Sequence, residues 1–260
     1  MILCGGQGTR IRDVTELLPK PMVPVGPHPM VWHIMKSFAA FGVRRFILCL
    51  GYKREVFTDY FLNYHARATD VTLRLGKEPS IVYHGNHGEE DWEVTLADTG
   101  DRTMTGGRVI RGAKYLRPGD QDFFLTYGDG LSDVDVTRLY QHHRGHDRAL
   151  TVTAVHPSGR FGEMKVTAGA VTGFHEKPQT EEGLINGGYM VLRRRFVDKY
   201  LTADQDLVLE QAPMRSAASD GQMSAYVHQG FWQCMDTQRE HQLLTQMWER
   251  GDAPWTARWA

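Results

Sequence analysis

Two short motifs near the start of the chain combine glycines with positively charged side chains. GGQGTR occupies residues 5–10, and PKP occupies residues 19–21. Glycine backbone can turn consecutive N–H groups toward an anion, and Arg10 and Lys20 add positive charge. Neither the dinucleotide fingerprint GxGxxG nor the P-loop pattern is matched. A glycine-rich turn after a strand explains the first motif taken alone. The two motifs together indicate a nucleotide-phosphate site of another kind.

Two acidic residues are candidates for binding a cation beside these phosphates. Asp129 lies in YGDG, directly after the apolar stretch 122–126, and Asp236 lies in WQCMDT. Magnesium prefers one or two carboxylates together with phosphate oxygens, so this pair predicts a magnesium site. A simple Asp-Gly turn is the alternative for Asp129, and an acid that stabilises a helix start is the alternative for Asp236.

Three further segments carry groups suited to sugar, phosphate or base contacts. Glu176 and Lys177 in GFHEKP combine an acceptor for hydroxyls with a point charge for a phosphate. INGG, at 185–188, brings the Asn186 amide and closely approachable backbone at Gly187. Residues 98–108 place hydroxyls and an arginine at an expected helix start, where free amides favour an anion or a base edge. The alternatives are a solvated ion pair, a turn and simple helix capping.

Histidines and cysteines give weaker signals. His142, His143 and His146 could face a metal from one helix turn, but we expect them on a solvated helix face. The chain has three widely spaced cysteines without a CxxC pair: Cys4, Cys49 and Cys234. This pattern argues against a disulfide framework or a zinc site, so we expect small buried side chains.

The candidate groups suit one class of reaction. A sugar phosphate has a second pKa near ~6, so it is already a dianionic nucleophile at neutral pH and needs no general base. The obstacle is that one anion must attack another. Arg10, Lys20, Lys177 and a magnesium ion would address it through positioning and spread positive charge, as in phosphoryl transfer generally.

Composition limits the partners. The 260 residues carry 30 Lys and Arg against 31 Asp and Glu, so no overall field favours nucleic acid or an anionic membrane. The longest apolar run, 46–50, is far shorter than a membrane span, and no charged leader precedes the first apolar residues. We therefore expect a cytoplasmic protein without nucleic-acid or membrane partners.

Hydrophobic periodicity predicts alternating strands and helices. The patterns indicate strands at 1–4, 45–50, 71–75, 81–83, 92–97 and 122–126, and helices at 31–42, 53–65 and 105–116. Residues 84–91 are typical of an insertion or mobile loop. Short strands follow from Ala149. The final helix, 237–248, begins with a capping box of Thr237 and Glu240 and should pack through Leu243, Leu244, Met247 and Trp248.

This alternation predicts an α/β fold whose sheet is mostly parallel and covered by helices on both faces, with ligands at the carboxyl ends of the strands. No linker divides the chain, so we expect one domain over 1–260. We assign a nucleotide-binding half at about 1–148, a sugar-phosphate-binding half at about 149–236, and a C-terminal helix at 237–250.

Longer strings carry a family resemblance. Besides GGxGTR and PKP, they are VWHIMK at 31–36, GYK at 51–53, DTGDRTMTGGR at 98–108, FLTYGDG at 124–130, GRFG at 159–162, EKP at 176–178, INGG at 185–188 and GFWQCMDT at 230–237. With these blocks in order, the chain resembles the sugar-1-phosphate nucleotidyltransferases, and most closely their glucose-1-phosphate cytidylyltransferase branch. The resemblance covers nearly the whole length.

The resemblance implies a single-domain, Rossmann-like nucleotidyltransferase fold with a small β extension. It implies magnesium-dependent transfer of a cytidylyl group from CTP to α-D-glucose 1-phosphate, giving CDP-glucose and pyrophosphate for deoxysugar biosynthesis. Relatives in the branch also imply a homo-oligomer. UTP, dTTP or another sugar 1-phosphate are the alternatives within the same chemistry, and a non-catalytic nucleotide-sugar-binding regulatory subunit is the alternative outside it.

Roles carry over by resemblance to matching positions. Arg10, Lys20 and Asp129 would be catalytic, and Asp129 and Asp236 would bind Mg²⁺. The sugar phosphate would contact Glu176, Lys177, Asn186 and Gly187. The nucleotide would contact Leu3, Cys4, Gly5, Gly6, Gly8, Thr9, Arg10, Lys20, Thr105, Arg108 and Gly128.

Some positions depart from the branch pattern. Gln7 replaces a leucine, His175 a glutamine and Cys234 a proline, and GEMKV replaces a more apolar run after GRFG. Gln7 and Cys234 lie beside presumed nucleotide or metal positions, so they bear on affinity. His175 and residues 163–165 lie nearer the presumed sugar, so they bear on the identity of the sugar.

Overall fold

A seven-stranded, mostly parallel sheet forms the centre of the protein. The computed structural model describes residues 1–6, 18–85, 88, 91–157, 163–167, 170–175 and 183–259. The strand order is β14 (Met223–His228), β10 (Leu150–Val155), β13 (Ile185–Arg193), β8 (Asp122–Tyr127), β1 (Ile2–Leu3), β4 (Arg45–Leu50) and β7 (Glu93–Asp98). In this sheet β13 runs antiparallel to both neighbours, and the other pairs are parallel. The predicted fold class is confirmed.

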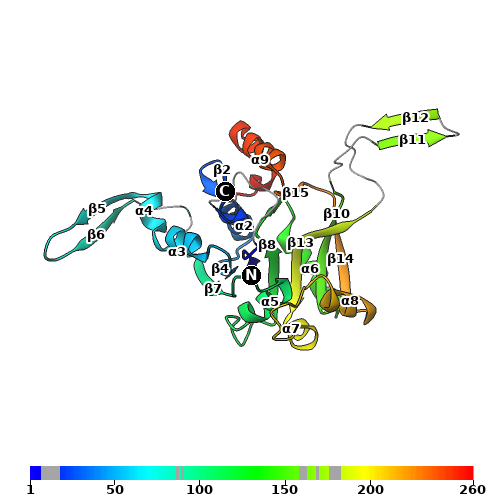
Figure 1. Cartoon of the computed structure of the whole chain (residues 1–260), viewed down its shortest axis with the longest axis horizontal. Helices are drawn as coiled ribbons and strands as arrows, with labels where there is room; N and C mark the ends of the chain where they lie inside the picture. Colours follow the sequence, from blue (N-terminus) through cyan, green and yellow to red (C-terminus); the bar gives the residue numbers. More distant parts are fainter. Residues whose placement is uncertain are drawn as a thin grey trace.

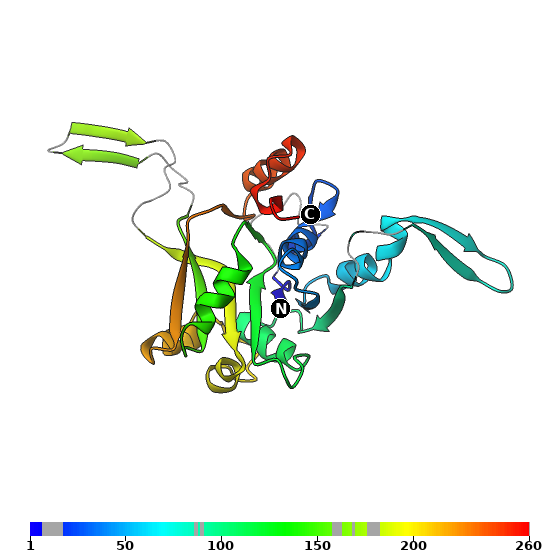
Figure 2. The same ribbon diagram turned by 180° about the vertical axis from the view of Figure 1, so that it is seen from behind.

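Helices cover both faces of the sheet (Figures 1 and 2). One core includes residues of α2 (Met30–Ala39), α3 (Arg54–Leu62) and α6 (Val136–Arg144). The other includes residues of α5 (Thr105–Ala113), α7 (Arg194–Tyr200) and α8 (Ala212–Ser219). Ile2 packs in the first core and Leu3 in the second, because successive side chains of a strand point to opposite faces.

Most predicted elements lie within a few residues of their expected bounds. The helix expected at 53–65 is instead two helices, α3 and α4 (Tyr64–Ala68), and the helix expected at 105–116 ends at Ala113. The loop expected at 84–91 begins one residue later, because residue 84 still belongs to a strand, and residues 86, 87, 89 and 90 lie outside the described residues.

The final helix, α9 (Gln238–Arg250), begins as predicted. Thr237 and Glu240 form the expected capping box, which satisfies two amides at the helix start. Leu244 is fully buried, but Leu243 is 38% exposed, so the prediction that Leu243 packs in the core was wrong. Adjacent helical residues point in directions about 100° apart, and only one of the two leucines faces the core.

The prediction of a solvated face for the three histidines was also wrong. His143 on α6 is fully buried, and its Nδ1 lies 2.8 Å from the Thr151 hydroxyl of β10. The Nε2 atom of His142 lies 3.0 Å from the Ser224 hydroxyl of β14. These side chains face the sheet and take part in packing α6 against it.

Two hairpins project from the body on opposite sides in Figure 1. One pairs β5 (Asp70–Arg74) with β6 (Ser80–His84), and the other pairs β11 (Glu163–Thr167) with β12 (Ala170–His175). Smaller elements are β2 (Pro24–Val25), β3 (His28–Pro29), β9 (Gly130–Ser132), β15 (Trp232–Cys234), and the 3₁₀ helices η1 (Lys20–Met22) and η2 (Pro254–Thr256). In the described part of the chain, no helix has the length and apolar character needed to cross a membrane.

One buried arginine joins the strand ends. Arg108 of α5 is 4% exposed and donates hydrogen bonds to the carbonyl oxygens of Leu50 at 3.0 Å, Gly100 at 2.9 Å and Gly5 at 2.9 Å. A Cβ added at Gly5 would lie 2.0 Å from the Arg108 guanidinium, so this glycine is required by close packing. The guanidinium therefore links the end of β4 with the loops after β1 and β7.

We expect Arg108→Lys to destabilise the fold by about 2 kcal/mol or more, because a lysine cannot reach several carbonyls with one planar fork and leaves buried acceptors unpaired. Urea denaturation measures the free energy of unfolding. Arg102→Lys, at a nearby exposed arginine, is the matched control and should have little effect. Equal losses in the two variants would contradict the linking role of Arg108.

Candidate functional site

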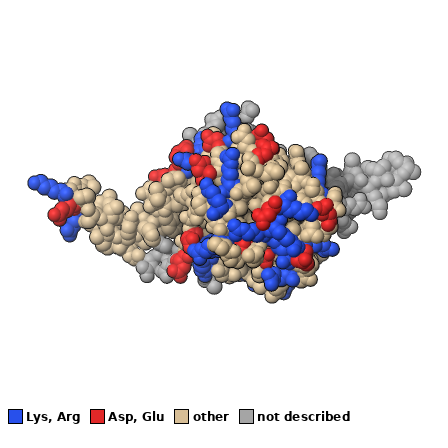
Figure 3. Space-filling model, turned by 90° about the horizontal axis from the view of Figure 1, so that it is seen from below, with Lys and Arg blue, Asp and Glu red and all other residues tan. Residues whose placement is uncertain are grey.

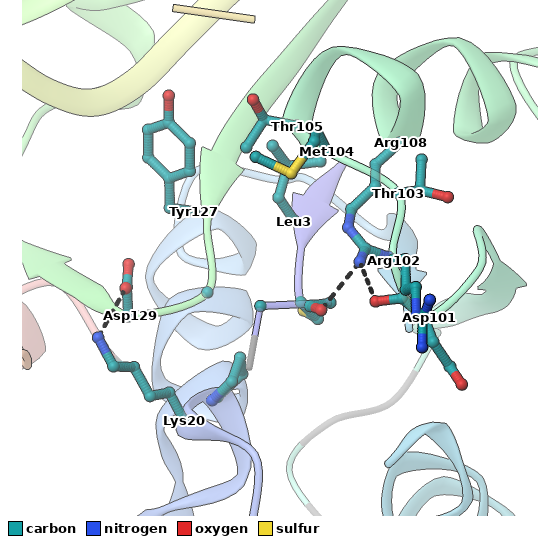
Figure 4. Close-up of a pocket in the computed structure, with 15 residues that line it drawn as sticks. Leu3, Lys20, Asp101, Arg102, Thr103, Met104, Thr105, Arg108, Tyr127 and Asp129 are labelled. Carbon is teal, nitrogen blue, oxygen red and sulfur yellow. Dashed lines mark hydrogen bonds and ion pairs between the residues drawn. The ribbon is translucent and has the colours of Figure 1, made fainter. Parts of the chain in front are cut away.

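A cleft of about 580 Å³ opens at the carboxyl ends of β1 and β8 (Figure 4). These strands are parallel neighbours, so the loops that follow them meet at one edge of the sheet. The predicted site residues that line the cleft are Leu3, Cys4, Gly5, Gly6, Lys20, Thr105, Arg108, Gly128 and Asp129. Gly8, Thr9 and Arg10 lie outside the described residues.

The PKP and YGDG motifs pack directly against each other. The Gly128 amide donates to the Leu3 carbonyl at 3.0 Å, and a Cβ added at Gly128 would lie 2.7 Å from Cγ of Pro21. This close approach brings Lys20 beside Asp129, although the two residues are far apart in the sequence. Glycine at 128 is therefore explained by packing at the edge of the cleft.

Lys20 lies between two carboxylates. Its Nζ atom donates a hydrogen bond to Asp236 and lies 3.6 Å from Oδ2 of Asp129. Burial favours the neutral amine, but the hydrogen bond to Asp236 and the charges of both carboxylates outweigh it and raise the pKa of Lys20. Burial also raises the pKa of Asp129, although Lys20 opposes the rise. Lys20 is a cation held at the meeting point of the strand ends.

The donor atoms here suit a divalent cation. One ligand atom each of Asp129, Asp236 and Cys234 lies within 4.8 Å of the others. Carboxylate oxygens are the ligands that magnesium prefers, whereas a thiol is a soft ligand. Since Lys20 contacts both carboxylates, an incoming cation would compete with its ammonium group.

The cysteine prediction holds at two positions out of three. Cys4 and Cys49 are buried and free, as expected of small core side chains. Cys234 is only half-buried, and its thiol lies among the candidate metal ligands. Its position at the end of β15 places it at the site, and the expectation of a plain buried side chain was wrong there.

A smaller cavity of about 270 Å³ adjoins the cleft and shares Tyr127 and Asp129 with it. The predicted sugar-contact residues Asn186 and Gly187 line this cavity. The Trp232 indole donates to the Gly187 carbonyl at 2.7 Å, which fixes that wall. Glu176 and Lys177 lie outside the described residues. The two chambers therefore meet at Tyr127 and Asp129.

The start of α5 differs from the expectation of free amides. The Gly106 amide donates to the Leu207 carbonyl at 2.8 Å, and the Gly107 amide donates to the same oxygen at 3.3 Å. The Thr105 hydroxyl donates to Glu210 at 2.7 Å and accepts from the Leu209 amide at 2.9 Å. The loop before α8 caps this helix, so these groups form a wall of the cleft and do not point free amides into it.

Sequence reasoning did not single out Tyr127 or Glu210. Tyr127 ends β8 and lines both chambers, and its hydroxyl donates to Glu210. Tyr127 stood in the FLTYGDG string, which is a signal that could have identified it. Glu210 stands in no motif, because its contacts are made across about a hundred residues of sequence.

Comparisons with known proteins identify the family of the chain. A family model described as nucleotidyl transferase matches residues 1–237. The glucose-1-phosphate cytidylyltransferase of Salmonella typhimurium is 43% identical over 255 residues, which cover 98% of this chain and 97% of that protein. A probable glucose-1-phosphate cytidylyltransferase of Bacillus subtilis is 38% identical over 255 residues, 98% of each chain.

Solved structures share the fold. HddC from Yersinia pseudotuberculosis superposes with a TM-score of 0.67 at 21% identity, covering 95% of this chain and 97% of that one. A UDP-glucose pyrophosphorylase complexed with UDP-glucose gives a TM-score of 0.64 at 14% identity, covering 96% and 97%. Since the family model covers most of the chain and the Salmonella relative is 43% identical over nearly its whole length, the chain belongs to the nucleotidyl transferase family.

Proposed function

We propose that this protein transfers a cytidylyl group from CTP to α-D-glucose 1-phosphate, giving CDP-glucose and pyrophosphate for deoxysugar biosynthesis. The observation that carries the proposal is the meeting of two chambers at Asp129, with Lys20 beside it. The similarity to the Salmonella cytidylyltransferase supports the choice of substrates. Because these substrates are charged metabolites, we propose that the enzyme acts in the cytoplasm.

The chemistry follows from the charges. CTP would occupy the larger cleft, and the sugar phosphate would occupy the smaller cavity. An oxygen of the sugar phosphate attacks the α-phosphorus of CTP, the bond from that phosphorus to the bridging oxygen of the β-phosphate breaks, and pyrophosphate leaves. Lys20 stabilises the charge that accumulates between the reacting phosphates. By resemblance, Arg10 holds the triphosphate and Lys177 the sugar phosphate.

We propose that the other site residues have the roles that the resemblance implies. Glu176, Asn186 and Gly187 would contact the sugar. Backbone from Leu3 to Gly6 and at Gly8 and Thr9 would hold the nucleotide, with Gly128 allowing close approach. The Thr105 hydroxyl and the Arg108 guanidinium already form hydrogen bonds to protein groups. These two residues would therefore contribute by shaping the wall of the cleft that holds the nucleotide.

We propose Mg²⁺ as the cofactor, held by Asp129 and Asp236. When bound, the ion would draw negative charge from the phosphates at the reacting centre. Lys20, which contacts both carboxylates, would add its positive charge beside the ion. Cys234 adds a soft donor beside these oxygens, where the branch pattern has proline.

Other substrates and another class of function are the alternatives. The same chemistry could use UTP, dTTP or another sugar 1-phosphate, and a regulatory subunit would bind nucleotide sugars without turnover. Against the regulatory alternative, Lys20, Asp129 and Asp236 are all present. Pyrophosphate release across a matrix of nucleoside triphosphates and sugar 1-phosphates, with magnesium, separates these cases. Turnover with another nucleotide and none with CTP would overturn the base assignment.

We expect Asp129→Asn to lower the rate of CDP-glucose formation by at least ~10², because it removes one electrostatic stabiliser of the reacting centre. Steady-state pyrophosphate release measures the effect. Asp59→Asn is the matched control, since Asp59 is an exposed acid of α3 whose partner is Arg67. Near-normal turnover by Asp129→Asn would count against the metal role.

We also propose a homo-oligomer, and the β5–β6 hairpin supports it. Two cross-strand pairs form one apolar face, Val71 with Tyr83 and Leu73 with Ile81, and these side chains are 36% to 58% exposed. Figure 3 shows this arm as mostly uncharged, with Lys, Arg and acidic groups at its tip. A lone two-stranded hairpin is marginally stable in water, and exposed apolar patches mark interfaces. A second copy of the chain would cover this face.

We expect the double change Leu73→Asp and Ile81→Asp to reduce the mass of the assembly, because it places charges on the apolar face that the partner copy would bury. Size-exclusion chromatography with light scattering measures the mass. Thr72→Asp, on the opposite face of the same strand, is the control and should leave the mass unchanged. A monomeric parent protein, or an unchanged mass in the double variant, would contradict this interface.

A further inference from the structure

Glu210 connects the two chambers of the site from outside both. It lies in the segment between α7 and α8, and its side chain is half-buried. Its carboxylate accepts a hydrogen bond from the Thr105 hydroxyl at 2.7 Å and another from the Tyr127 hydroxyl. Thr105 lines the larger cleft, and Tyr127 lines the cleft and the smaller cavity. One carboxylate therefore holds side chains that face both binding spaces.

Tyr127 is held by Glu210 at its hydroxyl and by close packing at its ring. Its ring packs on Gly188, where an added Cβ would lie 2.6 Å from Cδ2 of the ring and where φ is +81°. Burial and the Glu210 charge raise the pKa of the Tyr127 hydroxyl, and a hydrogen bond from Asn186 opposes part of the rise. The hydroxyl is therefore a neutral donor fixed at one end by Glu210, next to a predicted sugar-contact residue.

The position of Thr105 is held in the same way. Thr105 is the first residue of α5, and its hydroxyl both donates to Glu210 and accepts from Leu209. A carboxylate at a helix N-terminus is favoured by the helix dipole. In Figure 4 the hydroxyls of Thr105 and Tyr127 lie at the end of the cleft away from Lys20. Glu210 thus fixes the wall of the cleft that lies opposite Lys20.

We propose that Glu210 is a positioning residue for the transfer reaction, holding Tyr127 and Thr105 so that the wall between the two chambers keeps the shape both substrates require. The inference rests on the proposed function. Glu210 itself lines neither chamber, so its effect passes through the two hydroxyl side chains. A change at Glu210 should therefore lower kcat/KM for both substrates, whereas a change at a residue that lines only one chamber should lower it for one substrate.

The test uses Glu210→Ala, Glu210→Gln and Tyr127→Phe in the full chain. We expect Glu210→Ala to lower kcat/KM for CTP and for glucose 1-phosphate by about tenfold or more, the factor typical of losing a hydrogen bond to a charged group. Glu210→Gln keeps the shape and an acceptor oxygen, so we expect it to restore most of this loss. In the Tyr127→Phe background, Glu210→Ala should lower kcat/KM by a smaller factor than it does in the parent.

Controls separate positioning from loss of folding. Glu93→Ala removes an exposed glutamate that bonds to Arg117, and it should leave both kcat/KM values unchanged. If Glu210→Ala does not fold, Tyr127→Phe still tests the proposal, because it removes one of the two hydroxyls that Glu210 holds: a raised KM for both substrates supports the proposal, and parent-like KM values overturn it. Parent-like kcat/KM for both substrates in Glu210→Ala, or costs that simply add in the double variant, would overturn it.

Failure of the proposed function gives a different result. If the parent enzyme shows no pyrophosphate release with any substrate pair, the proposed function fails, and calorimetric binding of nucleoside triphosphates then tests Glu210 directly. Weaker nucleotide binding by Glu210→Ala than by the parent supports the positioning role of Glu210. Equal binding overturns it.

Discussion

The contact of the Lys20 ammonium with two carboxylates is the constraint on which the site depends. Asp129 and Asp236 repel each other at one edge of the sheet, and the Lys20 ammonium that contacts both offsets this repulsion. To supply this cation, the chain must bring η1, which carries Lys20, against the end of β8. The segment after β15 must return to the same place with Asp236. Close packing of Pro21 on Gly128 makes that approach possible. The same arrangement holds the Lys20 ammonium where positive charge would be needed when phosphates bind.

Around this centre, the walls of the site are built by contacts between distant segments. Arg108 links the end of one parallel strand with the loops after two others through their carbonyl oxygens, and the segment 204–211 caps α5 from the second half of the chain. β8 belongs to the first half of the chain and β13 to the second, and these two strands are hydrogen-bonded neighbours in one sheet. The division at about residue 148 stays a prediction about binding roles, and the folded framework runs across it.

Sequence patterns predicted the framework well, where periodicity and local chemistry decide the structure. β4 has the predicted bounds, and the capping box of Thr237 and Glu240 starts α9. The errors come from burial, which depends on neighbours far away in the sequence. His143 looked solvated but packs on β10, and the amides at the start of α5 looked free but bond to Leu207.

The sequence by itself determined the chemistry available: glycine loops, Lys20, Asp129 and Asp236 in strings that indicate a family and a reaction class. It could do so because these motifs are local and their residue types limit what they can bind. Only the tertiary structure decided that Cys234 lies among the candidate metal ligands, that Arg108 bonds to backbone carbonyls, and that Glu210 holds Thr105 and Tyr127 together. Those contacts join residues about a hundred positions apart, and their energies depend on distances that exist only after folding.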